Sequence, residues 1–238
     1  MRVVAALTKK EFKGYFQSPI AYIYLVAFLV FTAWFFFRGF FVMNVATMRG
    51  FFSLMPWTFL FLIPAVTMRL WAEEQKLGTM EVLMTWPLRE YEAVLGKFLA
   101  GLGFLAVSLL LTLPLAVTVF LVGDPDPGPI LTGYLGLLFM GGAYLAIGLF
   151  ASSLSENQIV AFIVGVFLTF VLFVIGEDFV LVAVPGSLAP LFGALGLGAH
   201  FSSIGRGVID SRDVIYYLSV IFFFLYLNVR RLESRKWR

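Results

Sequence analysis

Long stretches of this chain contain no charged residue, and the charges gather in short segments between them. Residues 98–122 and 130–150, for example, include no Asp, Glu, Lys or Arg. A helix of about 20 apolar residues is long enough to cross the hydrocarbon core of a bilayer. Only 13% of the 238 residues are charged, against roughly 25% in soluble domains, so a soluble core is excluded. The sequence therefore predicts an all-α polytopic membrane protein.

Six apolar segments have the composition of membrane spans, and they form a single transmembrane domain over residues 1–238. They lie at residues 20–37, 52–70, 98–122, 130–150, 158–176 and 214–229. With six spans, thirteen of the seventeen Lys and Arg residues lie on one side, together with both termini. Because basic loops remain in the cytoplasm, we expect both termini to be cytoplasmic. A seventh span would place the basic C-terminal tail on the translocated side.

Two apolar segments are not counted as spans. Residues 2–17 place Arg2, Lys9 and Lys13 on one helical face and Phe12 and Tyr15 toward the other, which predicts an amphipathic helix in the membrane interface. Residues 179–201 are interrupted by several prolines and glycines. We expect these residues to form two half-helices, a broken re-entrant hairpin on the outer side before the last span.

Small residues in the fourth predicted span favour close helix packing. Gly142 and Ala146 are separated by three residues, the spacing that lets another membrane helix approach closely. We therefore expect Gly142 and Ala146 to lie at a helix–helix contact.

A polar island, residues 69–97, separates the second and third predicted spans. It contains five of the fourteen acidic residues and four of the seventeen basic ones, which predicts a solvated loop. Within it, Leu77, Met80, Leu83 and Met84 recur at helical spacing. This pattern predicts a short helix whose apolar face docks onto another protein.

Nothing in the sequence predicts catalysis, a bound metal or a cofactor. The chain has no phosphate-binding loop of the GxxxxGK[ST] pattern, so it is not expected to bind ATP itself. It has no cysteine and one histidine, and nothing favours binding to nucleic acid. A membrane-embedded enzyme remains a rival class, for which only Glu177, Asp178, Asp210 and Asp213 could serve.

The island resembles the first cytoplasmic loop of type-2 ATP-binding-cassette (ABC) permeases. The resemblance rests on Glu73-Glu74, Gly78-Thr79, Glu81, Leu83, Pro87 and Gly96-Lys97. In that family the loop forms a coupling helix that docks on the nucleotide-binding subunit. The resemblance implies an ATPase-coupling role for ten residues: Glu73, Glu74, Leu77, Gly78, Thr79, Met80, Glu81, Leu83, Met84 and Pro87.

Four short motifs are similar to the gliding-motility-associated branch of that family. They are SPIAY at residues 18–22, NQIVAF at 157–162, RGVID at 206–210 and LESRKW at 232–237. The resemblance implies a plasma (inner) membrane protein of a prokaryote that lies among membrane lipid. Its implied partners are an ABC ATPase subunit that binds ATP, a second permease copy or paralogue, and a membrane protein with a large outer domain.

The function implied by the resemblance is coupling of ATP hydrolysis in a separate subunit to export or mechanical work across the membrane. The alternative is a non-transporting mechanotransmission subunit that acts on an outer, membrane-anchored partner. A dry, sealed interface between two permease copies would favour this alternative.

Overall fold

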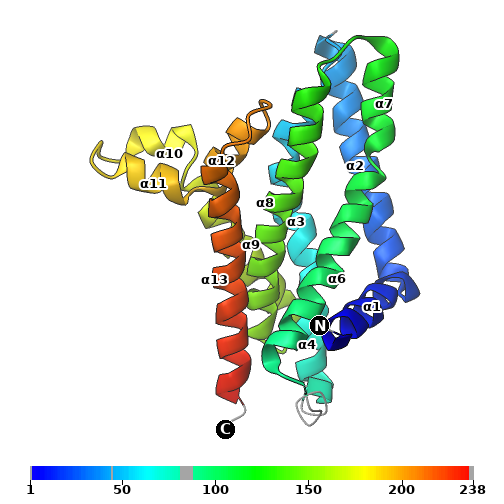
Figure 1. Ribbon diagram of the computed structural model, residues 1–238, viewed down its shortest axis with the longest axis vertical. Coiled ribbons are helices and arrows are strands. Elements are labelled where there is room, and N and C mark those ends of the chain that lie inside the picture. Colours follow the sequence, from blue (N-terminus) through cyan, green and yellow to red (C-terminus); the bar gives the residue numbers. More distant parts are fainter. Residues whose placement is uncertain (1, 44, 81–87, 236–238) are drawn as a thin grey trace.

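The computed structural model describes residues 2–43, 45–80 and 88–235, and its elements are all helices (Figure 1). In chain order these are α1 (Arg2–Gln17), α2 (Pro19–Met43), α3 (Arg49–Thr67), α4 (Arg69–Lys76), α6 (Glu90–Leu110), α7 (Leu113–Val122), α8 (Pro127–Ser153), α9 (Gln158–Val174), α10 (Asp178–Ala183), α11 (Ala189–Leu195), α12 (Leu197–Ile204) and α13 (Ser211–Arg235).

Five helical segments of the described chain are long and apolar enough to cross a membrane. They are Pro19–Val42, Arg49–Lys76, Glu90–Val122, Pro127–Ser153 and Ser211–Ser234. The chain is therefore a multi-pass helical membrane protein. The remaining predicted span forms α9, an apolar helix of only 17 residues. At 1.5 Å per residue, α9 is about 25 Å long. Because α9 is not one of the five segments of spanning length, the count of six spans remains a prediction.

The third predicted span differs from its expected form at both its start and its middle. Helix α6 begins at Glu90, well before residue 98, and ends at Leu110; α7 resumes after a two-residue turn. Pro114 explains the turn, because proline has no N–H to donate to the carbonyl of Leu110. The Thr112 hydroxyl instead donates to the carbonyl of Leu109 at 2.7 Å.

Helix α8 is the centre of the bundle, where it packs against α3, α6, α9 and α13. Its glycines allow these neighbours to approach closely. A Cβ added at Gly133 would lie 2.5 Å from Cζ of Phe52 in α3, and one added at Gly141 would overlap Cδ2 of Leu105 in α6. The absence of side chains at these positions therefore sets the distances from α8 to α3 and α6.

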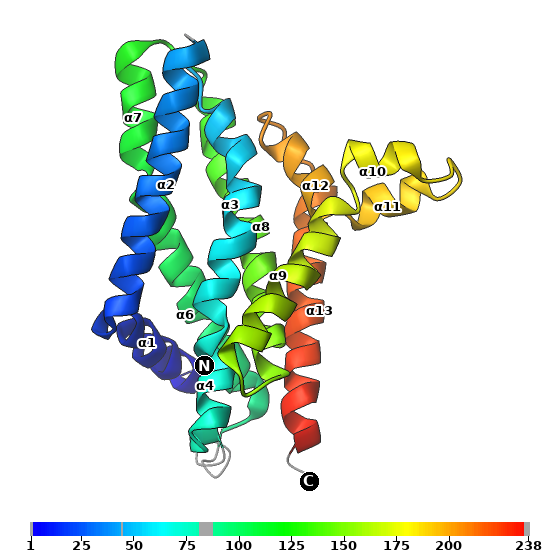
Figure 2. The same cartoon turned by 180° about the vertical axis from the view of Figure 1, so that it is seen from behind.

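Helix α1 crosses the base of the bundle instead of running parallel to it (Figure 2). It rests on α6, where a Cβ added at Gly96 would lie 2.7 Å from Cδ2 of Leu7. Further along, the ring of Tyr15 stacks on Phe104 with centroids 4.9 Å apart. The inward face of α1 is thus packed on α6, and its basic face, with Lys9 and Lys13, is exposed.

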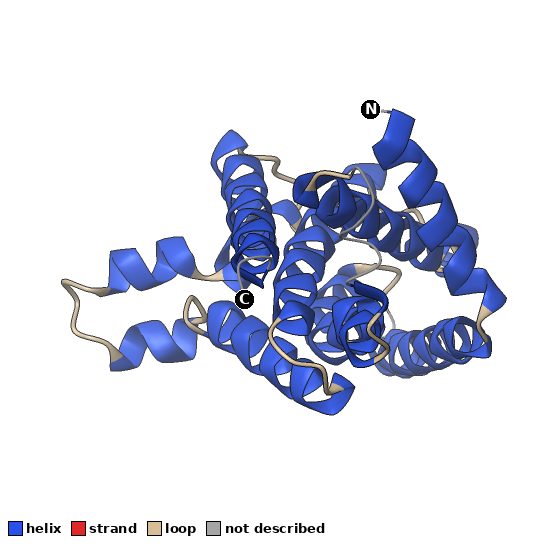
Figure 3. Cartoon of the chain, turned by 90° about the horizontal axis from the view of Figure 1, so that it is seen from below, coloured by secondary structure: helices blue, strands red, loops and turns tan. Residues whose placement is uncertain are grey.

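Helices α10 and α11 form a hairpin that projects sideways from the bundle, as the view from below shows (Figure 3). The hairpin turns at residues 184–188, which include Pro185 and Gly186, and a second break at Gly196 precedes α12. At the base of the hairpin a Cβ added at Gly176 would lie 2.6 Å from Cα of Gly196. The placement of this hairpin relative to the membrane remains a prediction.

The close packing of α8 predicts that Gly133→Ala destabilises the protein. The added methyl group would overlap the buried ring of Phe52, and overpacking of this kind costs about 1–3 kcal/mol. We expect a lower unfolding temperature in detergent. Gly39→Ala in α2 is the matched control, because nothing lies within 4 Å of the added Cβ. A Gly133→Ala protein as stable as the Gly39→Ala protein would contradict the close contact.

Candidate functional site

The polar island begins as a direct continuation of the α3 helix. The amide of Met68 donates to the carbonyl of Pro64 at 2.8 Å, so the backbone stays helical from α3 into α4. Helix α4 buries Leu70, Trp71, Ala72 and Gln75 and leaves Glu73 and Lys76 exposed. The first part of the island is therefore a packed helical arm, and the expectation of a solvated loop is wrong for these residues.

Ser152, near the end of α8, fixes α4 in place. Its hydroxyl donates to the carbonyl of Met68 at 2.7 Å and accepts from the amides of Trp71 at 3.0 Å and Ala72 at 3.2 Å. Both amides lie in the first turn of α4, directly after the α3–α4 junction at Met68. The side-chain amide of Gln75 also donates to the carbonyl of Ser153 at 3.1 Å. The start of α4 is thus capped from another helix.

A buried lysine connects the other side of α4 to α6 and α1. Lys97 of α6 is 2% exposed, and its Nζ lies 2.6 Å from Oε1 of Glu74 in α4. The same Nζ lies 3.5 Å from Oε2 of Glu11 in α1 and 4.9 Å from the ring centroid of Trp71. One ammonium group of α6 therefore contacts two other helices, α4 and α1, and joins three helices. We call Lys97, Glu74, Glu11 and Trp71 the lysine cluster.

The lysine cluster compensates for the cost of removing an ammonium group from water. An isolated buried charge is very unfavourable, but two carboxylates and the face of an indole ring stabilise this one. Glu74 and Glu11 keep 26% and 18% of their side-chain surface exposed, although Oε2 of Glu74 is buried and has no hydrogen-bond partner in the described part of the chain. The cluster therefore adds charged contacts to the apolar packing of these three helices.

A small cavity of about 310 Å³ lies beside the lysine cluster, between α1 and α4. Arg69 borders it, with its guanidinium 5.7 Å from the ring centroid of Tyr15 and its Nη1 donating to Ser18 Oγ at 3.3 Å. Burial raises the pKa of the Tyr15 phenol above its ordinary value, and the charge of Arg69 opposes this shift more weakly. Arg69 therefore holds the junction of α1 and α2 against the start of α4.

The residues predicted for ATPase coupling do not all share one environment. Leu77 is 66% exposed, whereas Met80 is 6% exposed, so these two side chains do not form one continuous exposed apolar face. Gly78 has φ of +68°, the left-handed conformation in which glycine commonly ends a helix, and α4 ends there. Glu73 and Thr79 are exposed. Four of the predicted residues lie outside the described residues: Glu81, Leu83, Met84 and Pro87.

Glu74 is paired within the chain. Its partner is Lys97, and the N-terminal helix supplies an acid, Glu11. In the sequence, Lys97 directly precedes a long apolar run and belongs to the Gly96-Lys97 pair that carries part of the family resemblance.

Gly142 and Ala146 of α8 lie in packing contacts within the chain. A Cβ added at Gly142 would lie 3.2 Å from Cδ1 of Ile221 in α13 and 3.5 Å from Cδ1 of Leu102 in α6. Ala146 is fully buried. Within the described chain, these small residues bring α13 and α6 together across α8.

A second polar cluster lies at the opposite end of the bundle, between α12 and α13. Asp213 accepts a hydrogen bond from Ser203 Oγ, and its Oδ1 lies 2.7 Å from Nδ1 of His200. The His200 ring stacks on Tyr216 with centroids 3.9 Å apart. The carboxylate lies between the hydroxyl and the imidazole, so the serine is not activated by the histidine as a nucleophile would be. This arrangement joins α12 to α13.

The other acidic residues considered for a membrane-embedded enzyme have local roles. Asp210 Oδ1 accepts from the amide of Arg212 at 2.9 Å, at the start of α13. Burial raises the pKa of the Glu177 carboxyl above its ordinary value, and the neighbouring Asp178 adds to this shift. Glu177 packs against Gly198 at the base of the hairpin.

The lysine cluster predicts a coupled effect of two substitutions. Lys97→Met leaves Glu74 and Glu11 without their cation and should lower the unfolding free energy by about 2 kcal/mol. This is less than for a fully buried pair, because both glutamate side chains keep part of their surface exposed. Glu74→Gln combined with Lys97→Met should cost less than the sum of the single changes.

The control for this cycle is Lys76→Met on the exposed side of α4, which should change the unfolding free energy by less than about 0.5 kcal/mol. Chemical unfolding in detergent measures the unfolding free energy of the unsubstituted protein and of the four variants. Additive effects of Lys97→Met and Glu74→Gln would show that the ion pair contributes nothing.

Comparisons with known proteins do not assign the chain to a family: no protein-family model matches it, and no curated protein matches it significantly.

Proposed function

We propose that this chain is the membrane-spanning permease subunit of a type-2 ABC transporter, in which a separate nucleotide-binding subunit hydrolyses ATP. One observation carries the proposal: a helical arm, α3 followed by α4, leads from the centre of the bundle to the polar island and is fixed to three other helices there. The resemblance of the island to the coupling loop of type-2 permeases supports the same function.

The connections of α4 explain how a force on the island would reach the membrane. A push on residues 77–87 acts on the end of α4, and α4 cannot shift alone without separating Glu74 from Lys97 or Ser152 from Met68. The displacement therefore passes to α1, α6 and α8 together. Because α3 and α6 both belong to segments long enough to cross the membrane, the bundle tilts as a unit.

The remaining parts of the proposal concern the assembly. An ABC ATPase subunit binds the island, and a second permease copy or paralogue completes the transporter in the plasma membrane of a prokaryote. A membrane protein with a large outer domain is a further partner. Both termini and the island face the cytoplasm, since the six-span arrangement assigns thirteen of the seventeen Lys and Arg residues to their side. Export or mechanical work on the outer partner is the output.

The proposed topology predicts which engineered cysteines are accessible from outside the cell. The chain has no native cysteine, so single substitutions can be labelled without background. Asp124→Cys, in the exposed turn between α7 and α8, should react with an impermeant thiol reagent in intact cells. Lys76→Cys is exposed at the end of α4 and should react only after the cells are opened. A cysteine at Gln75, the preceding residue, would be unsuitable for labelling because Gln75 is buried. Labelling of Lys76→Cys in intact cells would contradict this topology.

The proposed coupling predicts that Leu77→Asp separates the permease from its ATPase. Leu77 is 66% exposed in the isolated chain, so an aspartate there should leave insertion and stability unchanged. In the complex it would place an unpaired carboxylate in an apolar contact, and ATPase retention should fall by about tenfold or more.

The measurement is mass spectrometry of the proteins that co-purify with the tagged chain from its native host, together with ATP turnover of the complex. Lys76→Ala, one residue earlier and also exposed, is the control and should retain the ATPase. Leu83→Asp tests the part of the island outside the described residues in the same way. Unchanged ATPase retention and turnover in both aspartate variants would remove the island as the coupling element.

A further inference from the structure

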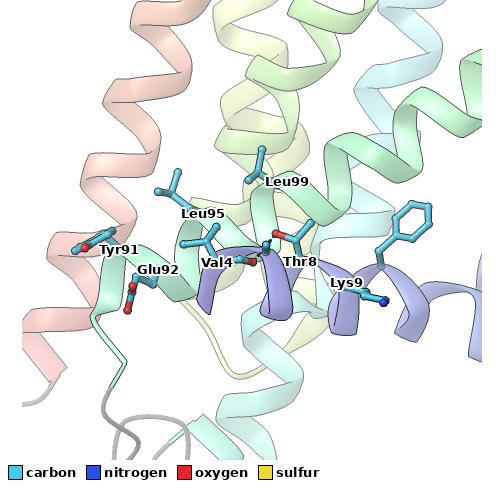
Figure 4. A pocket seen from close by; sticks show the side chains of 9 residues that line it. Val4, Thr8, Lys9, Tyr91, Glu92, Leu95 and Leu99 are labelled. Carbon is cyan, nitrogen blue, oxygen red and sulfur yellow. Dashed lines mark hydrogen bonds between the residues drawn. The ribbon is translucent and has the colours of Figure 1, made fainter. Parts of the chain in front are cut away.

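An open apolar groove of about 730 Å³ lies between the first half of α1 and the start of α6 (Figure 4). Val4, Ala5 and Phe12 line it from α1, and Leu95 and Leu99 line it from α6. Its volume is within the roughly 300–1,000 Å³ range of ligand pockets. The groove is therefore as large as a typical ligand pocket, and most of its lining is apolar.

The groove exists because α1 packs on α6 along only one line. Leu7 is seated against Gly96, and Phe12 lies over Gly103, so these contacts fix the two helices at a set separation. Beside this line Leu99 remains 41% exposed and Tyr91 44% exposed. In Figure 4, Leu95 and Leu99 extend from α6 above α1, on the side away from the polar island. The apolar surface thus continues from α1 toward the membrane-spanning part of α6.

Positive charge accompanies the groove on the α1 side. Arg2, Lys9, Lys10 and Lys13 are all exposed, and Lys9 itself borders the groove. The acidic residue of α1, Glu11, is directed inward to Lys97. One acidic residue, Glu92 of α6, also lines the groove, and its Oε2 accepts from the amide of Arg89 at 3.1 Å at the start of its own helix. The exposed charge of α1 is therefore positive.

We propose that this groove binds one anionic phospholipid, with an acyl chain along Leu95 and Leu99 and its phosphate near Lys9. A phospholipid has both an apolar tail and a negative headgroup, which match the apolar lining and the basic border. The adjacent segment Glu90–Val122 is of membrane-spanning character, so lipid is the molecule present at this surface. A bound lipid contacts α1 and α6 at once and stabilises their packing. This site is independent of any ATPase partner.

The test compares lipids and matched charge variants of the purified full chain in detergent. After delipidation, the protein is titrated with phosphatidylglycerol or phosphatidylcholine, and bound lipid is counted by native mass spectrometry. We expect one phosphatidylglycerol per chain at low concentration, a weaker phosphatidylcholine adduct and a higher unfolding temperature with phosphatidylglycerol. Lys9→Glu should weaken phosphatidylglycerol binding by about fivefold or more, as expected for a basic residue close to an anionic headgroup.

Two further variants separate a defined site from general attraction. Lys10→Glu makes the same charge change on the next residue, which is exposed but does not line the groove, and should weaken binding less than Lys9→Glu. Ala5→Trp fills the groove without changing charge and should also reduce the phosphatidylglycerol adduct. Equal binding of both lipids, equal effects of Lys9→Glu and Lys10→Glu, or full binding to Ala5→Trp would each overturn the proposal.

Discussion

The ammonium group of Lys97 determines how three helices meet at one end of this protein. It is almost completely removed from water, and it pairs with Glu74 of α4 and Glu11 of α1. A buried cation tolerates little change in its surroundings, because a carboxylate that moves away leaves the charge uncompensated. The positions of α1, α4 and α6 are therefore linked more tightly than apolar packing alone would make them, since apolar contacts are not directional.

Two consecutive residues of α6 fix α1 by different physical means. Gly96 accepts the side chain of Leu7, which sets the distance between the helices, and Lys97 pairs with Glu11, which selects the register of α1 along α6. A small residue alone would let α1 slide, and a charge alone would let it tilt. The same arrangement leaves the side of α6 that carries Leu95 and Leu99 uncovered. The groove beside α1 is thus a direct result of how α1 is held.

The helical, membrane-embedded character of the chain could be predicted from the sequence, because apolar runs of spanning length allow few other structures. The sequence also contains a signal for the turn between α6 and α7, because Pro114 lies within a predicted span. The lysine cluster could not be predicted. Glu74 and Lys97 are 23 residues apart, and Ser152 and Trp71 are 81 apart, so their contacts depend on how the helices pack. Short-range periodicity carries no information about such pairs.

Helix α9 and the hairpin that follows it have a consequence for the surrounding bilayer. Ile159, Ile163 and Phe167 are exposed along α9, so this helix presents an apolar flank. If α9 crosses the membrane, its length of about 25 Å is less than the roughly 30 Å of an average hydrocarbon core. The sideways projection of α10 and α11 then follows the end of the short helix (Figure 2). Lipids on this flank must compress to match it, so hydrophobic mismatch would distinguish this side of the protein from the others.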